Sequence, residues 1–472
     1  MSGSDTARGA LVGIGTVVVE RAIAFVVVLV LARTLTPETF GRYGYLLAGM
    51  TLVQVMADQG VEVAAVAAMS SAPARVGEIL GATALLRALV WALVAVPVGW
   101  LLLPAFAADG DNRMLAGAGL AASMLVLFGA SISMRGVLRA RGAMGAMAGV
   151  ALADAIVGGG AVIVVARAGA GLAAIFLARA VASALVTAVA LAVGPDLPPR
   201  GHGTGETLGR LAGVAAPLGG NALLIAVHTR AGHLVAMMLA GPRVVGLLGV
   251  AARLTEVLGV LPEGALLALF PRMAASPGDA AALAADAARR LAALALAAIV
   301  VLAVGATPLV TVLFGEAYAA AGPAVAILAW IALLAVTGGV TLHALVARGA
   351  ERTLLPANLI AAVVGVGMQV VLVRAFGLAG AAAATVATAG LGQIVLALST
   401  AARPVLVAVW RAVAPLVVLA AIAVVAGRIT APTIAGAIAA TAGYVGIAAA
   451  LGLIGADDWR ALRRALVLPS RG

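Results

Sequence analysis

The sequence contains no cysteine and no lysine, and it has only four histidines. Without cysteine the chain forms no disulfide, no thiolate metal site and no thiol nucleophile. The histidines show no HExxH or paired-histidine spacing, so neither a metal centre nor a cofactor is expected. Charged residues are also scarce, at 10% of the chain, and the net charge of +11 comes wholly from arginine.

Apolar residues dominate what is present. They make up 64% of the 472 residues, and the mean hydropathy is +1.17. A soluble chain is about half apolar and about a quarter charged, so this composition predicts an all-α polytopic membrane protein without separate soluble domains. Most arginines lie in short connections between apolar runs, which indicates membrane topology rather than nucleic-acid binding. We expect the apolar run after the short polar N-terminus to be an uncleaved first helix.

Apolar runs of about 20 residues, separated by proline, glycine and arginine, predict about fourteen transmembrane helices. Arginine gathers in alternate connections, most clearly in 135–141, 348–352 and 456–472, which places both termini in the cytoplasm. An arrangement with about twelve spans would keep this orientation. The connection 271–288 predicts an amphipathic helix at the membrane surface. The predicted spans are 10–33, 40–68, 78–103, 114–138, 143–167, 170–193, 208–239, 244–270, 289–314, 321–347, 354–376, 378–400, 404–427 and 431–455.

An internal repeat divides the chain into two halves. The segments PETFGRYG at 37–44 and PRVVGLLG at 242–249 share the pattern PxxxGxxG and follow the first and the seventh span. Equivalent positions in two six-helix halves indicate parallel repeats related by an axis along the membrane normal, with a solute cleft between them. The predicted domains are an N-lobe at 1–193, a cytoplasmic linker at 194–207, a C-lobe at 208–400, two further helices at 401–455 and a basic cytoplasmic tail at 456–472.

Charged residues inside the predicted spans are the candidate functional residues, because a charge at the centre of a membrane helix costs about 2.5–3.5 kcal/mol. Asp58 and Glu62 lie on one face of the second span together with Gln54, and Glu62 can alternatively reach water at the cytoplasmic side. Glu20 and Arg21 are adjacent in the first span. They therefore point about 100° apart, and each needs a partner elsewhere or water.

Two further carboxylates have expected arginine partners. Asp154 in the fifth span is expected to pair with Arg87 or Arg179, although both arginines can instead extend to water at the ends of their spans. In the eighth span Arg253 and Glu256 have the spacing i, i+3, so they can neutralise each other within one helix. Such a pair would be a structural explanation for both charges.

The seventh span carries polar residues on two sides. Asn221 and His228 share one face, whereas Arg230 and His233 lie nearly opposite. Glu263 lies near the cytoplasmic end of the eighth span, where we expect a structural role or part of a gate. The sequence leaves open whether Arg230 faces the cleft or pairs with an acid.

Several longer segments resemble the oligosaccharide-lipid flippases and polysaccharide exporters of the multidrug/oligosaccharidyl-lipid/polysaccharide exporter superfamily. They are LARTLTPETFGRYGYLLA at 31–48, DQG at 58–60, GPRVVGLLGVAARLTE and LFPRM at the two ends of 241–273, LFGEAYAAAGPAVAILA at 313–329, LVARGAERTLLPANL at 345–359 and FGLAGAAAATVAT at 376–388. The resemblance implies two six-helix lobes, a central cavity and outward transfer of a lipid-linked sugar. It also implies that the last two helices have a counterpart in the lipid II flippase branch.

In the related flippases the first, seventh and eighth helices line the cavity. An arginine-lined cavity suits a polyprenyl-diphosphate-linked glycan, because guanidinium binds phosphate oxygens through two parallel hydrogen bonds and keeps its charge. The resemblance therefore implies substrate binding by Arg21, Arg230, Arg253, His228 and Asn221. Coupling to H⁺ or Na⁺, or ion pairing, is expected for Asp58, Glu62, Glu20, Asp154 and Glu256.

The expected function is that of an ion-coupled flippase in the bacterial inner membrane, working by alternating access without covalent chemistry. Lipid II is an alternative cargo that the sequence does not separate from an oligosaccharide. A multidrug or metabolite antiporter of the same superfamily is a second alternative, against which the arginines argue. A membrane-embedded enzyme is disfavoured, because no extramembrane loop is long enough to carry a catalytic motif. A monomer and an association with a polymerase both fit the sequence.

Overall fold

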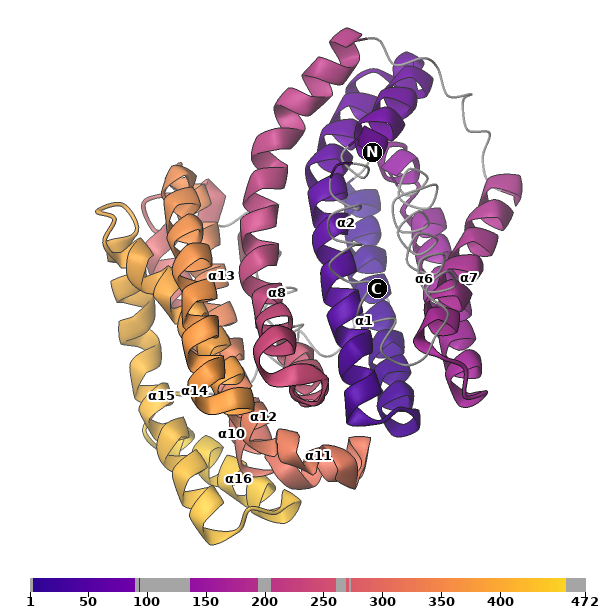
Figure 1. Cartoon of the computed structure of the whole chain (residues 1–472). Coiled ribbons are helices and arrows are strands. Elements are labelled where there is room, and N and C mark those ends of the chain that lie inside the picture. The colour runs from indigo at the N-terminus through magenta and orange to yellow at the C-terminus, as the bar shows by residue number, and fades with distance from the viewer. Residues whose placement is uncertain are drawn as a thin grey trace. The chain divides into compact units, whose positions relative to one another are not determined.

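The computed structural model describes residues 3–89, 93, 136–193, 205–259, 269–270 and 273–455. In these residues every regular element is a helix (Figure 1). The chain divides into two compact units, Met1–Gly246 and Leu247–Gly472. The predicted linker at 194–207 lies almost wholly outside the described residues, so the predicted lobe boundary stays a prediction.

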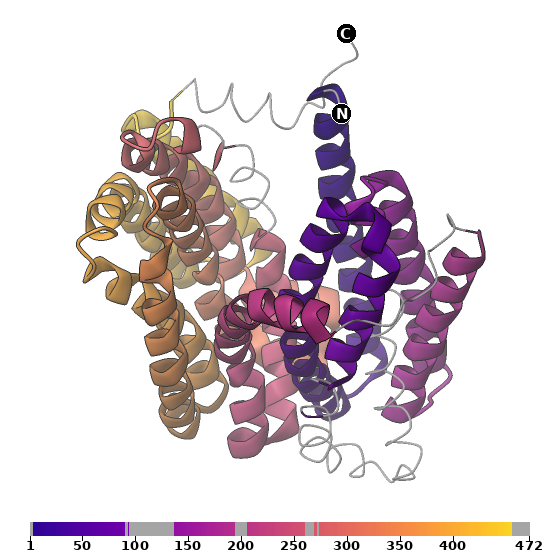
Figure 2. The same ribbon diagram turned by 90° about the horizontal axis from the view of Figure 1, so that it is seen from above.

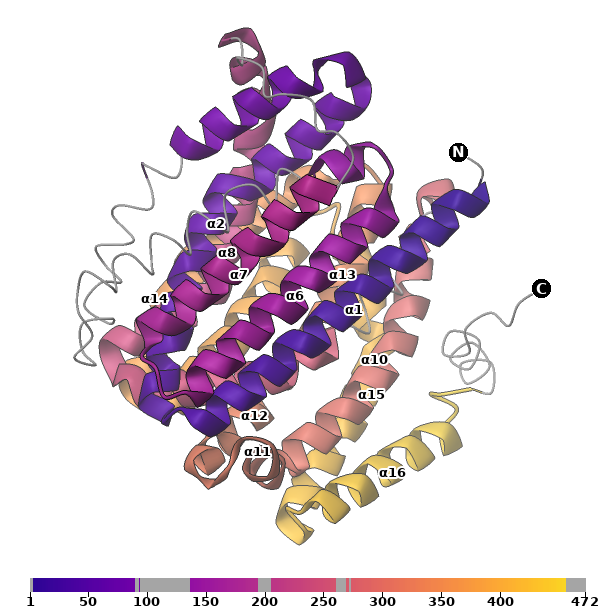
Figure 3. The same ribbon diagram turned by 90° about the vertical axis from the view of Figure 1, so that its right-hand side faces the viewer.

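The first unit contains α1 (Gly3–Thr34), α2 (Pro37–Ser71), α6 (Met144–Arg167), α7 (Leu172–Val193) and the part of α8 (Gly205–Glu256) that ends at Gly246. In this unit α6 packs against both α1 and α7, and Figure 3 shows the three helices side by side. Helical residues also occupy 76–89 and 136–140.

The start of α2 is set by local sequence. Thr36 is the N-cap, and its side-chain oxygen accepts a hydrogen bond of 3.2 Å from the backbone N–H of Thr39, while Pro37 occupies the first helical position. In the next turn the ring of Tyr43 stacks on Phe176 of α7, with ring centroids 5.2 Å apart. This stacking holds the start of α2 against α7.

The second unit is built around α10. This helix packs against α13, α15 and α16, and the orange-to-yellow helices of the unit form one group in Figure 2. Small residues make the close packing possible, since Ala284, Ala288 and Ala292 of α10 are fully buried. The helices of this unit are α10 (Ala280–Val304), α11 (Ala306–Phe314), α12 (Gly322–Leu328), α13 (Ile331–Ala347), α14 (Leu354–Ala397), α15 (Arg403–Thr430) and α16 (Ile434–Ala450), with the 3₁₀ turns η3 (Glu316–Ala321) and η4 (Glu351–Thr353).

Glycines break the helices where the sequence predicts span boundaries. The backbone of α8 leaves helical geometry at Gly241 (φ 82°), and that of α14 does so at Gly377 (φ 54°). Left-handed φ values favour glycine because a Cβ would be strained there. Both breaks coincide with predicted boundaries, the first after span 208–239 and the second between spans 354–376 and 378–400.

One prediction for the second unit needs correction, and another is tested only in part. Helix α10 begins at Ala280, within the connection 271–288, and its first turns have one buried face, with Ala280 and Ala284 completely buried and Ala282 and Asp286 exposed. The position of this segment at the membrane surface stays a prediction. The predicted span 289–314 is divided at Gly305, where α10 ends and the separate helix α11 begins.

Eight helical stretches among the described residues are long and apolar enough to cross a membrane. They agree with a multi-pass, all-helical membrane protein. The count of about fourteen spans and the cytoplasmic placement of both termini stay predictions, in part because much of the predicted spans 78–103 and 114–138 lies outside the described residues.

Candidate functional site

The first five residues of each PxxxGxxG copy, 37–41 and 242–246, meet in the first unit, where the start of α2 lies against the break in α8. A Cβ added at Gly41 would collide with the carbonyl oxygen of Pro242, and one added at Gly246 would collide with that of Pro37. The contact is therefore reciprocal, with the backbone of each copy filling the space that a side chain would need in the other. Such close backbone approach between helices requires small residues.

An ion pair lies beside this contact. Arg243 Nη1 donates to Glu38 Oε1 at 3.2 Å, and the side chain of Arg243 is largely exposed whereas that of Glu38 is partly exposed. A hydrogen bond from its own backbone N–H, followed by the charge of Arg243, holds the pKa of the Glu38 carboxyl below its ordinary value. The first unit thus carries both a steric and a charged contact between α2 and α8, and we call the four residues Glu38, Gly41, Arg243 and Gly246 the α2–α8 contact.

In α1, Arg21 is exposed and Glu20 is half-buried. Each of these two side chains interacts with another residue. Adjacent residues of a helix point in different directions, so each charge needs its own partner. Arg230 in α8 is likewise half-buried and has an interaction partner, as does His233. Arg21 and Arg230 both belong to the first unit.

Arg253 and Glu256 form the expected pair, with Arg253 Nη1 2.7 Å from Glu256 Oε2. This pair lies in the second unit. The side chains of Asp58, Asn221 and His228 lie outside the described parts of α2 and α8, and Glu263 lies outside the described residues altogether.

Asp154 has the arginine partner that its position in the fifth span predicts. Arg179 donates through Nη2 to Asp154 Oδ2 at 2.7 Å and through Nη1 to Oδ1 at 3.2 Å, and Ser183 donates to Oδ1 at 2.5 Å. The guanidinium lies directly over Gly158, where a Cβ would collide with it. Arg87, the other expected partner, is 4% exposed and does not extend to water.

Glu62 is also ion-paired. Arg139 Nη1 lies 3.0 Å from Glu62 Oε1, and the pair lies near the cluster of buried apolar residues that includes Val61, Ala65 and Val137. The side chain of Glu62 is about one-fifth exposed, with a relative accessibility of 21%. The structure therefore places three of the predicted carboxylates, Asp154, Glu62 and Glu256, in ion pairs with arginine.

A polar network in the second unit was not singled out by the sequence. Gln393 donates through Nε2 to the Leu334 carbonyl and to Thr337, both at 2.9 Å, and its Oε1 accepts a hydrogen bond of 3.0 Å from Trp410 Nε1. The signal in the sequence that could have predicted this network is an isolated glutamine in an apolar helix, because a buried amide needs hydrogen-bond partners. The network joins α13, α14 and α15.

Within the described part of the chain, no group of three or more histidine, aspartate or glutamate side chains is placed to hold a metal ion. Arginine supplies most of the charged side chains of the described residues, and several of these arginines pair with carboxylates, among them Arg139, Arg179 and Arg253. Arginine recognises anions, and phosphate above all.

Comparison with known proteins links this arrangement to a family. The sequence profile of a family described as polysaccharide biosynthesis protein matches residues 30–323. No curated protein matches the sequence.

Solved structures show the same fold. The lipid II flippase MurJ in an inward closed conformation is similar with a TM-score of 0.75 at 12% identity, over 94% of this chain and 98% of that one. An inward-facing multidrug resistance MATE family transporter of the MOP superfamily has a TM-score of 0.60 at 20% identity, over 83% and 96% of the two chains. The eukaryotic MATE transporter AtDTX14 has a TM-score of 0.55 at 14% identity, over 86% and 97%. At these identities the likeness concerns the fold.

Proposed function

The chain belongs to the family of polysaccharide biosynthesis proteins, and on that premise we propose that it is a flippase for a lipid-diphosphate-linked oligosaccharide. It would move a polysaccharide repeat unit from the cytoplasmic to the outer leaflet of the bacterial inner membrane by alternating access, with the lipid tail remaining in the bilayer. The family match over residues 30–323 is the observation that carries this proposal. No covalent step is required of the protein.

Arginine side chains support an anionic cargo. We propose that Arg21, Arg230 and Arg253 contact the diphosphate, assisted by Asn221 and His228. A guanidinium keeps its charge at every physiological pH and presents two parallel N–H groups to phosphate oxygens. The Arg253–Glu256 pair fits this role if Glu256 releases Arg253 when a diphosphate arrives, since both groups compete for the same donors.

The carboxylates divide into two groups under this proposal. Glu62 and Asp154 are held by arginines, so we assign them to the stability of the first unit. Asp58 and Glu20 then stay the proposed binding groups for the coupling ion, H⁺ or Na⁺. A deep carboxylate is suited to this work, because its charge can be compensated either by a proton or by a cation.

Lipid II is a second candidate cargo. The fold comparison covers 94% of this chain with the lipid II flippase and 83% with the inward-facing MATE transporter. The larger coverage would follow if the two C-terminal helices α15 and α16 have counterparts in the lipid II flippase. Rescue of a strain depleted of its lipid II flippase would assign this cargo, and a failure to rescue would favour an oligosaccharide.

The multidrug antiporter is the weaker alternative. Cationic drugs call for acidic cavities, whereas three of the carboxylates are paired with arginines here. Deleting the gene should therefore leave drug tolerance unchanged.

The direct test is the location of lipid-linked repeat units in a deletion strain. We expect these precursors to accumulate in the cytoplasmic leaflet, together with loss of surface polysaccharide, and we expect both to be restored by the gene in trans. An unchanged distribution of the precursors between the leaflets, together with an unchanged amount of surface polysaccharide, would contradict the proposal.

A further inference from the structure

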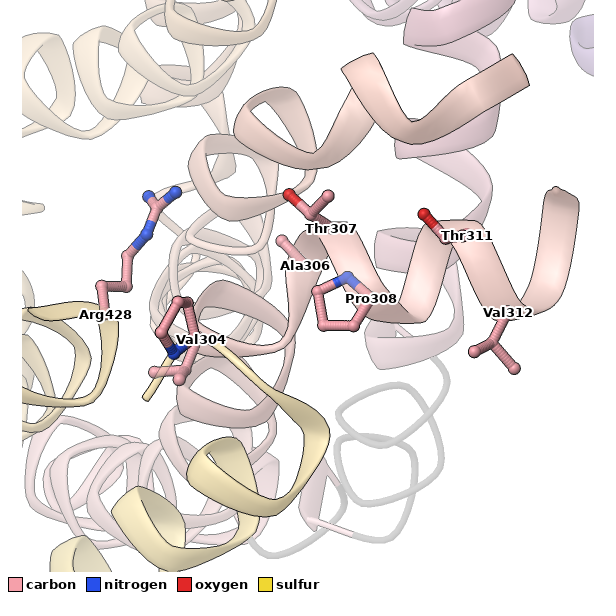
Figure 4. Close-up of a pocket in the computed structure, with 8 residues that line it drawn as sticks. Val304, Ala306, Thr307, Pro308, Thr311, Val312 and Arg428 are labelled. Carbon is pink, nitrogen blue, oxygen red and sulfur yellow. The ribbon is translucent and has the colours of Figure 1, made fainter. Parts of the chain in front are cut away.

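A cavity of about 450 Å³ opens in the second unit, where α10 ends, α11 begins and α15 ends. Figure 4 shows the side chain of Arg428 at one side and those of Thr307 and Thr311 of α11 at the other. The volume falls within the range of small-molecule sites, about 300–1,000 Å³. The lining residues are Val304, Ala306, Thr307, Pro308, Thr311, Val312, Arg428 and Pro432.

The polar groups of this cavity suit an anion. Arg428 is exposed and forms no ion pair or hydrogen bond with any residue that the structure describes, and the lining contains no carboxylate. The hydroxyls of Thr307 and Thr311 also make no hydrogen bond within the described residues. By contrast, Thr430 donates to the carbonyl of Ala426 at 2.8 Å, the usual arrangement for a threonine in a helix. Two hydroxyl donors and one guanidinium are therefore available to a ligand.

An apolar stripe on α15 leads to the cavity. Val418, Ile422, Val425 and Ile429 are each 59% exposed or more, and their spacing of four, three and four residues places them on one helix face. In a membrane helix such a face contacts lipid chains. Arg428, beside Ile429 in the last turn, is at the end of the span, where arginine reaches the level of the lipid phosphates.

We propose that this cavity binds the phosphate head group of a membrane phospholipid, whose acyl chain lies along the stripe on α15. The guanidinium of Arg428 and the two threonine hydroxyls donate to the phosphate oxygens, and Val304, Pro308 and Pro432 surround the glycerol backbone. The cation has no acidic competitor in the cavity, and the apolar stripe favours a lipid over free inorganic phosphate as the occupant. The site shares no residue with the proposed contacts to the transported diphosphate.

The test is lipid retention by the purified protein, measured by native mass spectrometry after titration with phosphatidylglycerol. The Arg428→Gln variant should lose about tenfold in apparent affinity, the usual effect of removing a charge-assisted contact. The matched control is Arg374→Gln. Arg374 is also exposed, and it does not line the cavity. It lies near the end of the predicted span 354–376, as Arg428 lies near the end of the predicted span 404–427. Two spans that form one hairpin separate these ends along the chain, so both ends are expected on the same side of the membrane. The Arg374→Gln variant should bind lipid as the unaltered protein does.

Three further measurements separate the alternatives. Thr311→Trp fills the cavity while keeping Arg428, and it should reduce binding as strongly as Arg428→Gln. Diacylglycerol, which has the chains but no phosphate, should bind at least tenfold more weakly than phosphatidylglycerol, and millimolar inorganic phosphate should not displace the lipid. Equal retention by Arg428→Gln and Arg374→Gln, equal binding of diacylglycerol, or displacement by inorganic phosphate would each overturn the proposal.

Discussion

Gly41 of α2 and Gly246 of α8 approach so closely that neither position has room for a Cβ. Each glycine lies in one copy of the PxxxGxxG pattern, and each faces the backbone of the other copy. The two copies of the internal repeat therefore contact each other in the folded chain.

A methyl group at Gly41 should disrupt this contact. Its Cβ would meet backbone atoms, which cannot rotate away, so we expect Gly41→Ala to destabilise the structure by about 1–3 kcal/mol, the usual cost of overpacking. The control is Gly44→Ala in the same pattern, where the nearest atom to a Cβ is Val245 Cγ1 at 3.9 Å. Thermal denaturation of the purified variants compares the two. Equal melting temperatures would mean that α2 and α8 can separate at no cost.

Because the chain has no cysteine, the same contact can be followed by thiol labelling without further changes to the background. A single cysteine at Val245, which is fully buried, should be labelled slowly by a maleimide. Adding Gly41→Ala should speed the labelling, and adding Gly44→Ala should not. Fast labelling in all three backgrounds would contradict a closed contact.

The Glu38–Arg243 pair should depend on pH. The pKa of Glu38 is lowered in the folded protein, so its stabilising contribution is present above the ordinary carboxyl pKa of about 4.3 and is lost as the pH falls through the lowered value. The pair is exposed, which limits the contribution to less than about 1 kcal/mol. Glu38→Gln should therefore lower the melting temperature slightly at pH 7, and the difference from the unaltered protein should shrink as the pH falls through the lowered pKa of Glu38. The control is Glu316→Gln, at an exposed residue without an ion pair among the described residues, which should leave the melting temperature at pH 7 unchanged.

Asp154 and Arg179 should depend on each other. The carboxylate is only 13% exposed, so Asp154→Ala leaves an uncompensated guanidinium and should cost about 2 kcal/mol, while the double variant should cost less than the sum of the two single variants. A double-mutant cycle measured by thermal denaturation gives the coupling free energy between Asp154 and Arg179. Asp286→Ala, whose pairs with Arg289 and Arg290 are more exposed, provides the comparison. Additive effects at Asp154 and Arg179 would remove this pair as a stabilising element.

The proposed cargo contacts predict a transport defect without loss of folded protein. Arg230→Ala and Arg253→Ala should each lower the flipping of a polyprenyl-diphosphate-linked glycan in proteoliposomes by about tenfold, because each removes a bidentate contact to phosphate. Lysine at either position should restore only part of the activity, since it lacks the planar pair of donors. Arg374→Gln serves as the control for a change in charge. Normal transport by both alanine variants would assign these arginines to the stability of the fold.

The local part of this fold was readable from the sequence. Apolar runs determined a helical membrane protein, because a bilayer requires backbone groups to be satisfied within each span. The boundaries at Gly241 and Gly377 followed from the glycines in short connections, and the Arg253–Glu256 pair followed from helical spacing alone. Each of these features depends on residues only a few positions apart.

The tertiary structure decided which distant residues meet. Asp154 had two arginines as possible partners, and the packing of α6 against α7 selected Arg179. The alanine-rich stretch 280–288 did not show which of its faces packs against other helices, and packing around α10 buried Ala280, Ala284, Ala287 and Ala288. The repeat was visible in the sequence, but only the structure showed that Gly41 and Gly246 form the contact, because helical periodicity specifies the face of a residue and not its neighbour.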